Sequence, residues 1–408
     1  GNFPYLATYG TNSSYNYLIN GSKPVIVKAP GLVAPDFTWE TVTQMDFGFD
    51  ASFLNNRLTG TFDWYRRNTK DMLVAGATLP ATLGASVPKS NSADMKTIGW
   101  ELSLGWNDRL ENGFSYWVKG VLSDYQATIT KYAGNDAGFY SQSDGDGKYY
   151  VGQKIGEIWG YVCNGLFQSQ DAIDTAFNGK GYKNDIMQTS VNYITHPGDM
   201  RFEDLNGTNS IDKGANTVDS PGDRQIIGNE EPRYIYTFSF SADWNNFFLS
   251  AMFDGVGKQD WYPSGESSFW GQYNRPYNQV PTWHLNNYWT EDNPNAYLPR
   301  YSGYYNPLYK GTANTRYLQD VSYIRLKNFQ FGYNLPKKWI AKAGLSHVSV
   351  YFSGENLWSW SPLYRYTKDY DVTVVTKGSD SDITSGNKGD GFNYPTMRNF
   401  SFGISITY

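Results

Sequence analysis

Apolar and polar residues alternate with a period of two over much of this chain. The clearest example is the C-terminal stretch, where small or polar residues separate five apolar ones: Phe400, Phe402, Ile404, Ile406 and Tyr408. Successive side chains of a β-strand point to opposite faces, so this stretch predicts a strand with one apolar and one polar face. A strand of this kind that ends the chain on an aromatic residue is typical of the closing strand of an outer-membrane β-barrel.

The same alternation recurs along the chain. It predicts further strands over residues 44–53, 57–64, 97–107, 114–123, 234–244, 247–253 and 348–355. Residues 54–56 separate the first two of these strands, which therefore read as a hairpin. Residues 323–333 fit less well, because Arg325 and Lys327 share a parity with apolar residues. We expect these two charges to lie above an apolar band.

Strand length separates a membrane barrel from a soluble β-sandwich or propeller, whose strands also alternate. The predicted strands reach about ten residues or more; a globular strand usually has roughly 5–6, and a tilted membrane strand needs about 9–11. Large aromatics lie toward the ends of the apolar faces, as in an interfacial girdle: Trp64, Trp106, Trp244 and Tyr408. Short turns also alternate with long polar connections. We therefore expect an all-β fold, a transmembrane antiparallel β-barrel with long extracellular loops.

Composition is compatible with this fold and excludes several classes of function. The mean hydropathy of -0.56 suits a barrel, in which only alternate strand residues meet lipid. No apolar run approaches the ~20 residues of a transmembrane helix. With 34 basic and 39 acidic residues, the chain has no basic footprint for nucleic acid. The single cysteine, Cys163, excludes an intramolecular disulfide, and three distant histidines form no metal-ligand spacing.

Seven segments, in order, resemble the SusC/RagA class of TonB-dependent outer-membrane transporters of Bacteroidetes. They are residues 37–50, 55–73, 198–207, 223–229, 326–336, 353–358 and 394–403. The resemblance implies a barrel of about 22 strands with a plugged lumen. Residues 1–408 would supply roughly the second half of that barrel. The chain starts without a signal peptide, so we expect the plug domain, the segment that contacts TonB and the earlier strands to lie outside it.

The resemblance also implies a function and partners. Members of this class import nutrients that are too large for porins, with energy from the inner-membrane TonB complex acting on the plug. A lipoprotein of the SusD class forms a lid over the barrel. We therefore expect a multi-pass protein of the outer membrane, surrounded by its lipid, that imports an oligosaccharide together with a SusD-like lipoprotein. Import of oligopeptides by the same mechanism is the alternative.

Two long outer loops, at about residues 126–232 and 258–320, are the predicted location of ligand contacts. Loops longer than ~12–15 residues are usually functional or disordered, and disordered segments are poor in aromatics. The second loop is rich in them, and aromatic faces beside polar groups suit sugar rings. The candidate contacts are Trp270, Tyr273, Trp283, Trp289 and Tyr304. The alternative is that these rings pack the loops together or against the lipoprotein, because Tyr and Trp are also interface residues.

A weak calcium-like pattern lies in the first loop. Oxygen-bearing side chains alternate there as in an EF-hand loop: Asp204, Asn206, Thr208 and Asp212. Position 6 of that pattern is Asn209 instead of glycine, and position 12 is Ala215. We therefore expect an ordered Asx-turn loop instead of a metal site, and no cofactor.

An enzyme is disfavoured by the motifs. Glu230 and Glu231 are adjacent and would diverge instead of facing each other across a glycosidic bond. No nucleophile elbow or phosphate-binding loop is present. A soluble glycan-binding β-domain, or a structural or adhesive barrel without transport, remains open from the residues alone.

Overall fold

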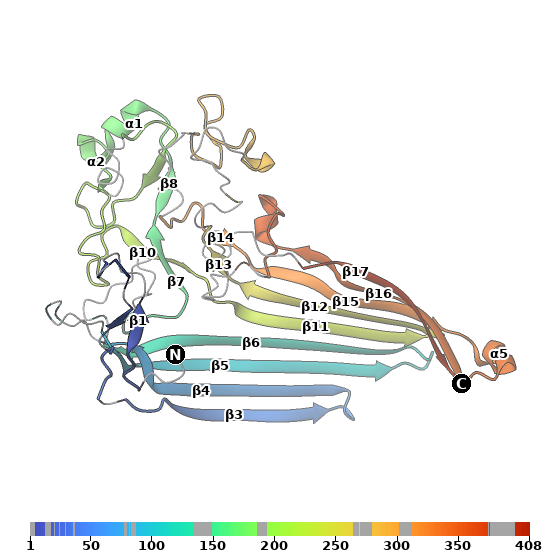
Figure 1. Cartoon of the computed structure of the whole chain (residues 1–408). Helices are drawn as coiled ribbons and strands as arrows, with labels where there is room; N and C mark the ends of the chain where they lie inside the picture. Colours follow the sequence, from blue (N-terminus) through green and yellow to red (C-terminus); the bar gives the residue numbers. More distant parts are fainter. Residues whose placement is uncertain are drawn as a thin grey trace.

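A long, curved antiparallel sheet and an irregular domain at one of its ends make up the protein (Figure 1). The computed structural model describes residues 5–12, 18–19, 21–23, 25–28, 30–35, 37–76, 80, 82, 87–133, 135, 149–185, 194–263, 269, 280–301, 312–373, 375 and 396–408. The sequence prediction of an all-β, antiparallel barrel fold is confirmed.

Nine strands form the sheet, which we call the strand wall. In chain order they are β3 (Thr41–Phe53), β4 (Leu58–Ala75), β5 (Lys89–Arg109), β6 (Ser115–Tyr132), β11 (Arg233–Trp244), β12 (Phe247–Lys258), β15 (Tyr323–Asn334), β16 (His347–Trp360) and β17 (Asn399–Thr407). Each strand pairs with the next in this order, so β3 and β17 are the edges of the described sheet. Up-and-down connectivity of this kind is that of a barrel wall.

The register explains the alternation of the sequence. Phe47 lies opposite Trp64, which lies opposite Trp100, so apolar residues of neighbouring strands share one face. The other face carries polar contacts such as the 2.7 Å hydrogen bond from the Thr61 hydroxyl to Asp50. The apolar face is open, with Phe47 66% exposed. A sheet with one open apolar face and one polar face is the wall of a membrane barrel with a hydrated lumen.

A β-bulge accounts for the irregular stretch in β15. Asn328 pairs with Met252, and Leu326 pairs with its neighbour Phe253, so Lys327 is an extra residue between two pairs. One extra residue switches the parity of the strand. Arg325 therefore lies on the polar face, where its guanidinium bonds the Asp254 carboxylate at 3.0 and 2.7 Å. The expectation that Arg325 lies above an apolar band is therefore wrong, because the bulge turns its side chain to the polar face.

Connections at the two ends of the strand wall differ in length. At one end, residues 54–57, 110–114, 245–246 and 335–346 join neighbouring strands, the last with α5 (Lys337–Ile340) and a 3₁₀ turn, η3 (Ala341–Ala343). At the other end the connections are residues 76–88, 133–232, 259–322 and 361–398. Short periplasmic turns and long extracellular loops give outer-membrane barrels this asymmetry. No helix among the described residues is long and apolar enough to cross a membrane.

Described parts of three long connections form what we call the outer loop domain: residues 149–185, 194–232, 259–263, 269, 280–301, 312–322, 361–373 and 375. Its elements are β7 (Glu157–Tyr161), β8 (Cys163–Leu166), α1 (Gln170–Asp174), α2 (Ala176–Gly179), β9 (Met200–Phe202), β10 (Arg224–Asn229), β13 (Asp260–Trp261), η2 (Thr282–His284), β14 (Gln319–Asp320) and η4 (Pro362–Arg365). Three antiparallel pairs connect them: β7 with β10, β8 with β9, and β13 with β14. A separate pair, β1 (Gly10–Asn12) with β2 (Ile26–Lys28), precedes the wall.

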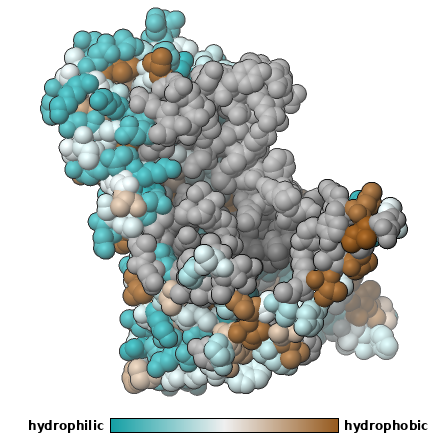
Figure 2. Space-filling model, turned by 60° about the vertical axis from the view of Figure 1, so that its left-hand side comes forward, coloured by the Kyte–Doolittle hydropathy of each residue, from teal (hydrophilic) through white to brown (hydrophobic). Residues whose placement is uncertain are grey.

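The two regions differ in surface chemistry as well as in structure. In Figure 2 hydrophilic residues cover much of the outer loop domain at the upper left, whereas apolar residues gather over the strands below. The main cluster of buried apolar residues lies inside the outer loop domain and includes Ile158, Phe167, Ile211, Leu298 and Tyr317. Among the described residues, the main apolar core therefore lies in the outer loop domain and not in the strand wall.

Candidate ligand-binding site

Aromatic contacts join the second loop of the outer loop domain, within residues 259–322, to the third loop, within residues 361–398. The ring of Trp261, from the second loop, lies 5.1 Å from Tyr370 of the third loop and 6.3 Å from Phe269. Phe269 is fully buried and lies 5.0 Å from the ring of Trp283. Aromatic pairs at these separations add to the free energy gained by burial. The loops thus form a packed scaffold around whatever site they carry.

Two of the five candidate aromatic contacts pack within this scaffold. Trp289 is 8% exposed, and its indole N–H donates to the side-chain amide oxygen of Gln168 at 3.1 Å. Trp283 is half-buried between Phe269 and Tyr366. Trp270, Tyr273 and Tyr304 lie outside the described residues. Loop packing explains the two described rings, and their contact with a ligand stays a prediction.

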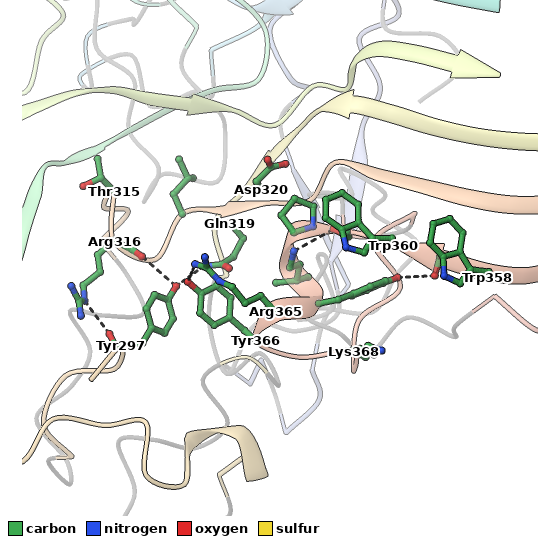
Figure 3. A pocket seen from close by; sticks show the side chains of 16 residues that line it. Tyr297, Thr315, Arg316, Gln319, Asp320, Trp358, Trp360, Arg365, Tyr366 and Lys368 are labelled. Atoms are coloured by element: carbon green, nitrogen blue, oxygen red, sulfur yellow. Dashed lines mark hydrogen bonds between the residues drawn. The ribbon is translucent and has the colours of Figure 1, made fainter. Parts of the chain in front are cut away.

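An open cavity of about 790 Å³ lies where the second and third loops meet the outer end of β16. We call it the Tyr297 pocket. Figure 3 shows Tyr297 and Tyr366 side by side, with Arg365 next to them and Trp358 and Trp360 farther along. The two tyrosine rings are stacked, with 4.2 Å between their centroids and planes 16° apart.

Hydrogen bonds fix one wall of the Tyr297 pocket. The Tyr297 hydroxyl donates to the Arg316 carbonyl at 3.2 Å and accepts from the Gln319 amide at 2.9 Å. The Arg316 guanidinium donates back to the Tyr297 carbonyl at 3.0 Å and to the Ala296 carbonyl at 2.8 Å. Burial, reinforced by the neighbouring Tyr366, raises the pKa of Tyr297, so its hydroxyl stays protonated at neutral pH. This wall is prearranged.

Exposed charged groups also line the pocket. Arg365 is exposed; its guanidinium bonds the Tyr366 hydroxyl and lies over that ring, 4.6 Å from the centroid. Asp320 and Lys368 are also exposed at the rim. Aromatic faces beside donors and acceptors of both charges suit a polar oligomer, because ring faces stack while hydroxyls or amides take the hydrogen bonds. The arrangement thus offers groups that can bind such a ligand.

The sequence prediction missed this part of the site. The third loop, which contributes Tyr364, Arg365, Tyr366 and Lys368, is not among the two loops singled out. The only sequence signal is the dense Trp-Ser-Trp-Ser-Pro-Leu-Tyr-Arg-Tyr run at residues 358–366. Trp358 and Trp360 pair with Leu326 and Ile324, so they belong to the apolar face of the wall, and they are 48% and 54% exposed. They are placed as the outer aromatic girdle.

The calcium-like loop is held together by its own hydrogen bonds. Asn206 and Thr208 both donate to the Asp212 carboxylate, at 3.2 and 2.9 Å. Asp204 accepts from three successive backbone N–H groups, those of Gly207, Thr208 and Asn209, at 2.7 to 3.1 Å. Burial opposes ionisation of Asp212, but the hydrogen bonds outweigh it and lower its pKa. Among the described residues, no group of three His, Cys, Asp or Glu side chains could hold a metal ion.

The sequence matches the model of a known protein family. The model of the family described as TonB dependent receptor-like, beta-barrel, matches residues 2–220, more than half of the chain. The chain belongs to this family.

Named relatives place the chain more narrowly. It is 26% identical to TonB-dependent receptor P3 of Formosa agariphila over 99% of its length and 38% of that protein's. It is 23% identical to TonB-dependent receptor SusC of Bacteroides thetaiotaomicron, over 100% of its length and 36% of that protein's. A solved structure, that of the RagAB peptide transporter, superposes with a TM-score of 0.68 at 20% identity, over all of this chain and 39% of that one.

The predicted SusC/RagA class and outer-membrane location are confirmed. The chain spans about two fifths of the length of these relatives. These relatives carry the names of receptors and a transporter, not of enzymes. In this family setting the apolar face of the strand wall meets lipid, and the polar face lines the lumen. The outer loop domain then stands at the extracellular mouth, and the Tyr297 pocket lies within it.

β17 occupies the place predicted for the closing strand. Its apolar residues are Phe400, Phe402, Ile404 and Ile406, and they lie opposite Gly354, Phe352, Val350 and Val348 of β16, in that order. These side chains are exposed on the lipid face, and Tyr408 follows the strand, 95% exposed. The free edge of β17 is available to pair with another strand. Closure of a barrel at this edge stays a prediction.

Proposed function

We propose that this chain forms part of the wall and extracellular mouth of a transporter that imports an oligomeric nutrient across the outer membrane. The carrying observation is the joint arrangement of a lumen-facing wall and a packed outer loop domain with an open polar–aromatic pocket. In this proposal the TonB complex supplies the energy through a plug outside residues 1–408, and a SusD-like lipoprotein covers the mouth. Membership of the SusC/RagA class supports both partners.

We propose an oligosaccharide as the ligand. The Tyr297 pocket combines a stacked tyrosine pair with Gln319, Asp320, Arg365 and Lys368, so ring faces and both kinds of hydrogen-bonding group are present. Import of a peptide is the second candidate, and the fold similarity to the RagAB peptide transporter supports it. Both ligands fit a pocket that reads aromatic and polar groups together.

Isolation of the native full-length protein in detergent, with mass spectrometry of what co-purifies, tests the proposal. A SusD-like lipoprotein together with bound oligosaccharide is the expected result. Bound short peptides would support the transport function but would show that the ligand is a peptide instead of an oligosaccharide. A protein that stays in solution without detergent and alone would contradict transport.

A single substitution tests the pocket. Tyr366→Ala removes the stacked ring that Arg365 lies over. We expect it to weaken ligand binding to the full-length transporter about tenfold, at the lower end of the roughly 1–3 kcal/mol that an aromatic side chain contributes when a nucleic-acid base stacks on it. Tyr149→Ala, in the same domain but outside the pocket lining, is the matched control. Equal losses in the two variants would assign the ligand to another surface.

A further inference from the structure

A second cavity, of about 230 Å³, lies where the strand wall meets the base of the outer loop domain. Its wall side is formed by Arg67 of β4, Thr97 of β5 and Tyr125 of β6; its loop side includes Ile155 and Glu231. Arg67 pairs with Thr97, which pairs with Ala127, so this side belongs to the polar, lumenal face. The cavity therefore opens toward the transport path and is separate from the Tyr297 pocket.

Glu231 is fixed in this cavity. The Tyr125 hydroxyl donates to its carboxylate at 3.3 Å, and its backbone N–H donates to the Asn229 side chain at 2.8 Å. Asn229 is held in turn by a 2.9 Å bond from its amide to the Ile155 carbonyl. A Cβ on Gly156 would come within 2.7 Å of the Glu231 side chain, so the loop backbone packs closely against it. The carboxylate thus presents acceptor oxygens with little freedom to turn away.

Arg67 differs from other arginines of the strand wall. Arg233 is neutralised by Asp124 at 2.5 and 2.6 Å, and Arg325 by Asp254. Arg66, the residue before Arg67, lies on the opposite face of β4, and its guanidinium donates to the Asn68 side chain at 3.3 Å. Arg67 is exposed and belongs to the lumenal face, and within the described part of the chain its guanidinium makes no hydrogen bond and no ion pair. Its five donors are available for a ligand.

We propose that this cavity binds a carboxylate-bearing unit of the transported oligomer. The Arg67 guanidinium binds the carboxylate in the bidentate geometry that this pair favours. Glu231 accepts a hydrogen bond from a neighbouring hydroxyl or amide of the same unit. An acidic sugar and an acidic peptide both carry this chemistry. The inference rests on the proposed import function and narrows its ligand class.

Binding by the purified full-length transporter, measured calorimetrically, tests the inference. The probes are a short oligogalacturonide and its carboxyl-reduced neutral counterpart, and oligoglutamate and oligoglutamine peptides. We expect one acidic probe to bind more tightly than its neutral counterpart. The identity of that probe shows whether the carboxylate comes from a sugar or from a peptide. Arg67→Gln should weaken that acidic probe about tenfold to a hundredfold, because a hydrogen bond to a charged group contributes roughly 1.5–3 kcal/mol, and leave the neutral probe within about twofold.

Two further variants separate binding from folding. Arg66→Gln removes the same charge from the opposite face of β4 and should leave every probe unchanged. Arg67→Lys keeps the charge without the bidentate fork, and we expect an intermediate loss. If Arg67→Gln weakens the binding of acidic and neutral probes equally, or weakens the binding of neither, the inference is overturned. The proposed import function is unaffected by that result. If the wild-type protein binds none of the four probes, the inference is overturned, whereas the proposed import function fails only if the native protein stays in solution without detergent and alone.

Discussion

Aromatic residues have opposite environments in the strand wall and in the outer loop domain. Phe402 of the wall is 85% exposed, whereas Phe269 of the outer loop domain is fully buried. The wall gains its stability from strand pairing, which gives the backbone groups of its inner strands partners on both sides, and from lipid around the apolar face. The outer loop domain is stabilised as a soluble protein is, by removing apolar surface from water. The number of aromatic residues therefore does not indicate a function by itself. Their spacing in the sequence and their neighbours in the fold determine whether they face lipid or pack in a core.

Truncating the aromatic core should break this comparison most visibly. Trp261 is 3% exposed and contacts the rings of Phe269 and Tyr370. Trp261→Ala should destabilise the outer loop domain by about 3–5 kcal/mol, as expected for a large ring removed from a core. Limited proteolysis should cut the loops sooner while the strand wall remains intact. Loss of the barrel from the outer membrane would instead show that the two regions fold as one unit.

A charge on the lipid face tests the other region. Phe402→Arg should cost about 2–4 kcal/mol if this residue lies near the bilayer midplane. Its neighbour Ser401 lies on the lumenal face, so Ser401→Arg is the matched control, and we expect it to be nearly neutral. Urea unfolding in lipid vesicles, followed by tryptophan fluorescence, measures both. Similar losses in the two variants would mean that β17 does not separate lipid from lumen.

Titration of a buried histidine should distinguish the loop core from the wall. Burial lowers the pKa of His284 from 6.5 to about 4, although a 2.8 Å contact with the Phe269 carbonyl partly opposes this. Between these two values His284 is protonated in the unfolded chain but neutral in the folded domain. The free energy of unfolding is therefore highest above pH 6.5 and falls as the pH drops toward 4. The loss amounts to about 3 kcal/mol at its largest.

Protease resistance of the loops as a function of pH measures this effect. His284→Gln should flatten the profile between these two pH values. His347→Gln, at the turn end of β16, is the control and should keep the wild-type slope. An unchanged slope in His284→Gln would assign the pH response to other groups.

Much of the strand wall could be predicted from the sequence, because alternation records the environment of each residue directly. The bulge at Lys327 could not: one extra residue looks like broken alternation until the partner strand is known. Nor could the Tyr297 pocket, since Tyr297 and Tyr366 are far apart in the chain and meet only when two loops pack. Local periodicity predicts strands, whereas long-range packing determines the site.

The smallest effect concerns how β17 is held against β16. The Tyr351 ring lies over Gly403 on the lumenal face, and a Cβ at Gly403 would come within 2.3 Å of that ring. An aromatic ring that covers a glycine in this way helps to fix strand register. Gly403→Ala should displace the ring and cost about 1 kcal/mol. At Gly120 of β6 an added Cβ meets nothing within 4 Å, so Gly120→Ala should be silent in the same urea assay. A loss equal to that of Gly120→Ala would mean that strand pairing alone sets the register. A selective loss would show that side-chain packing contributes to the wall as well, at its lumenal face.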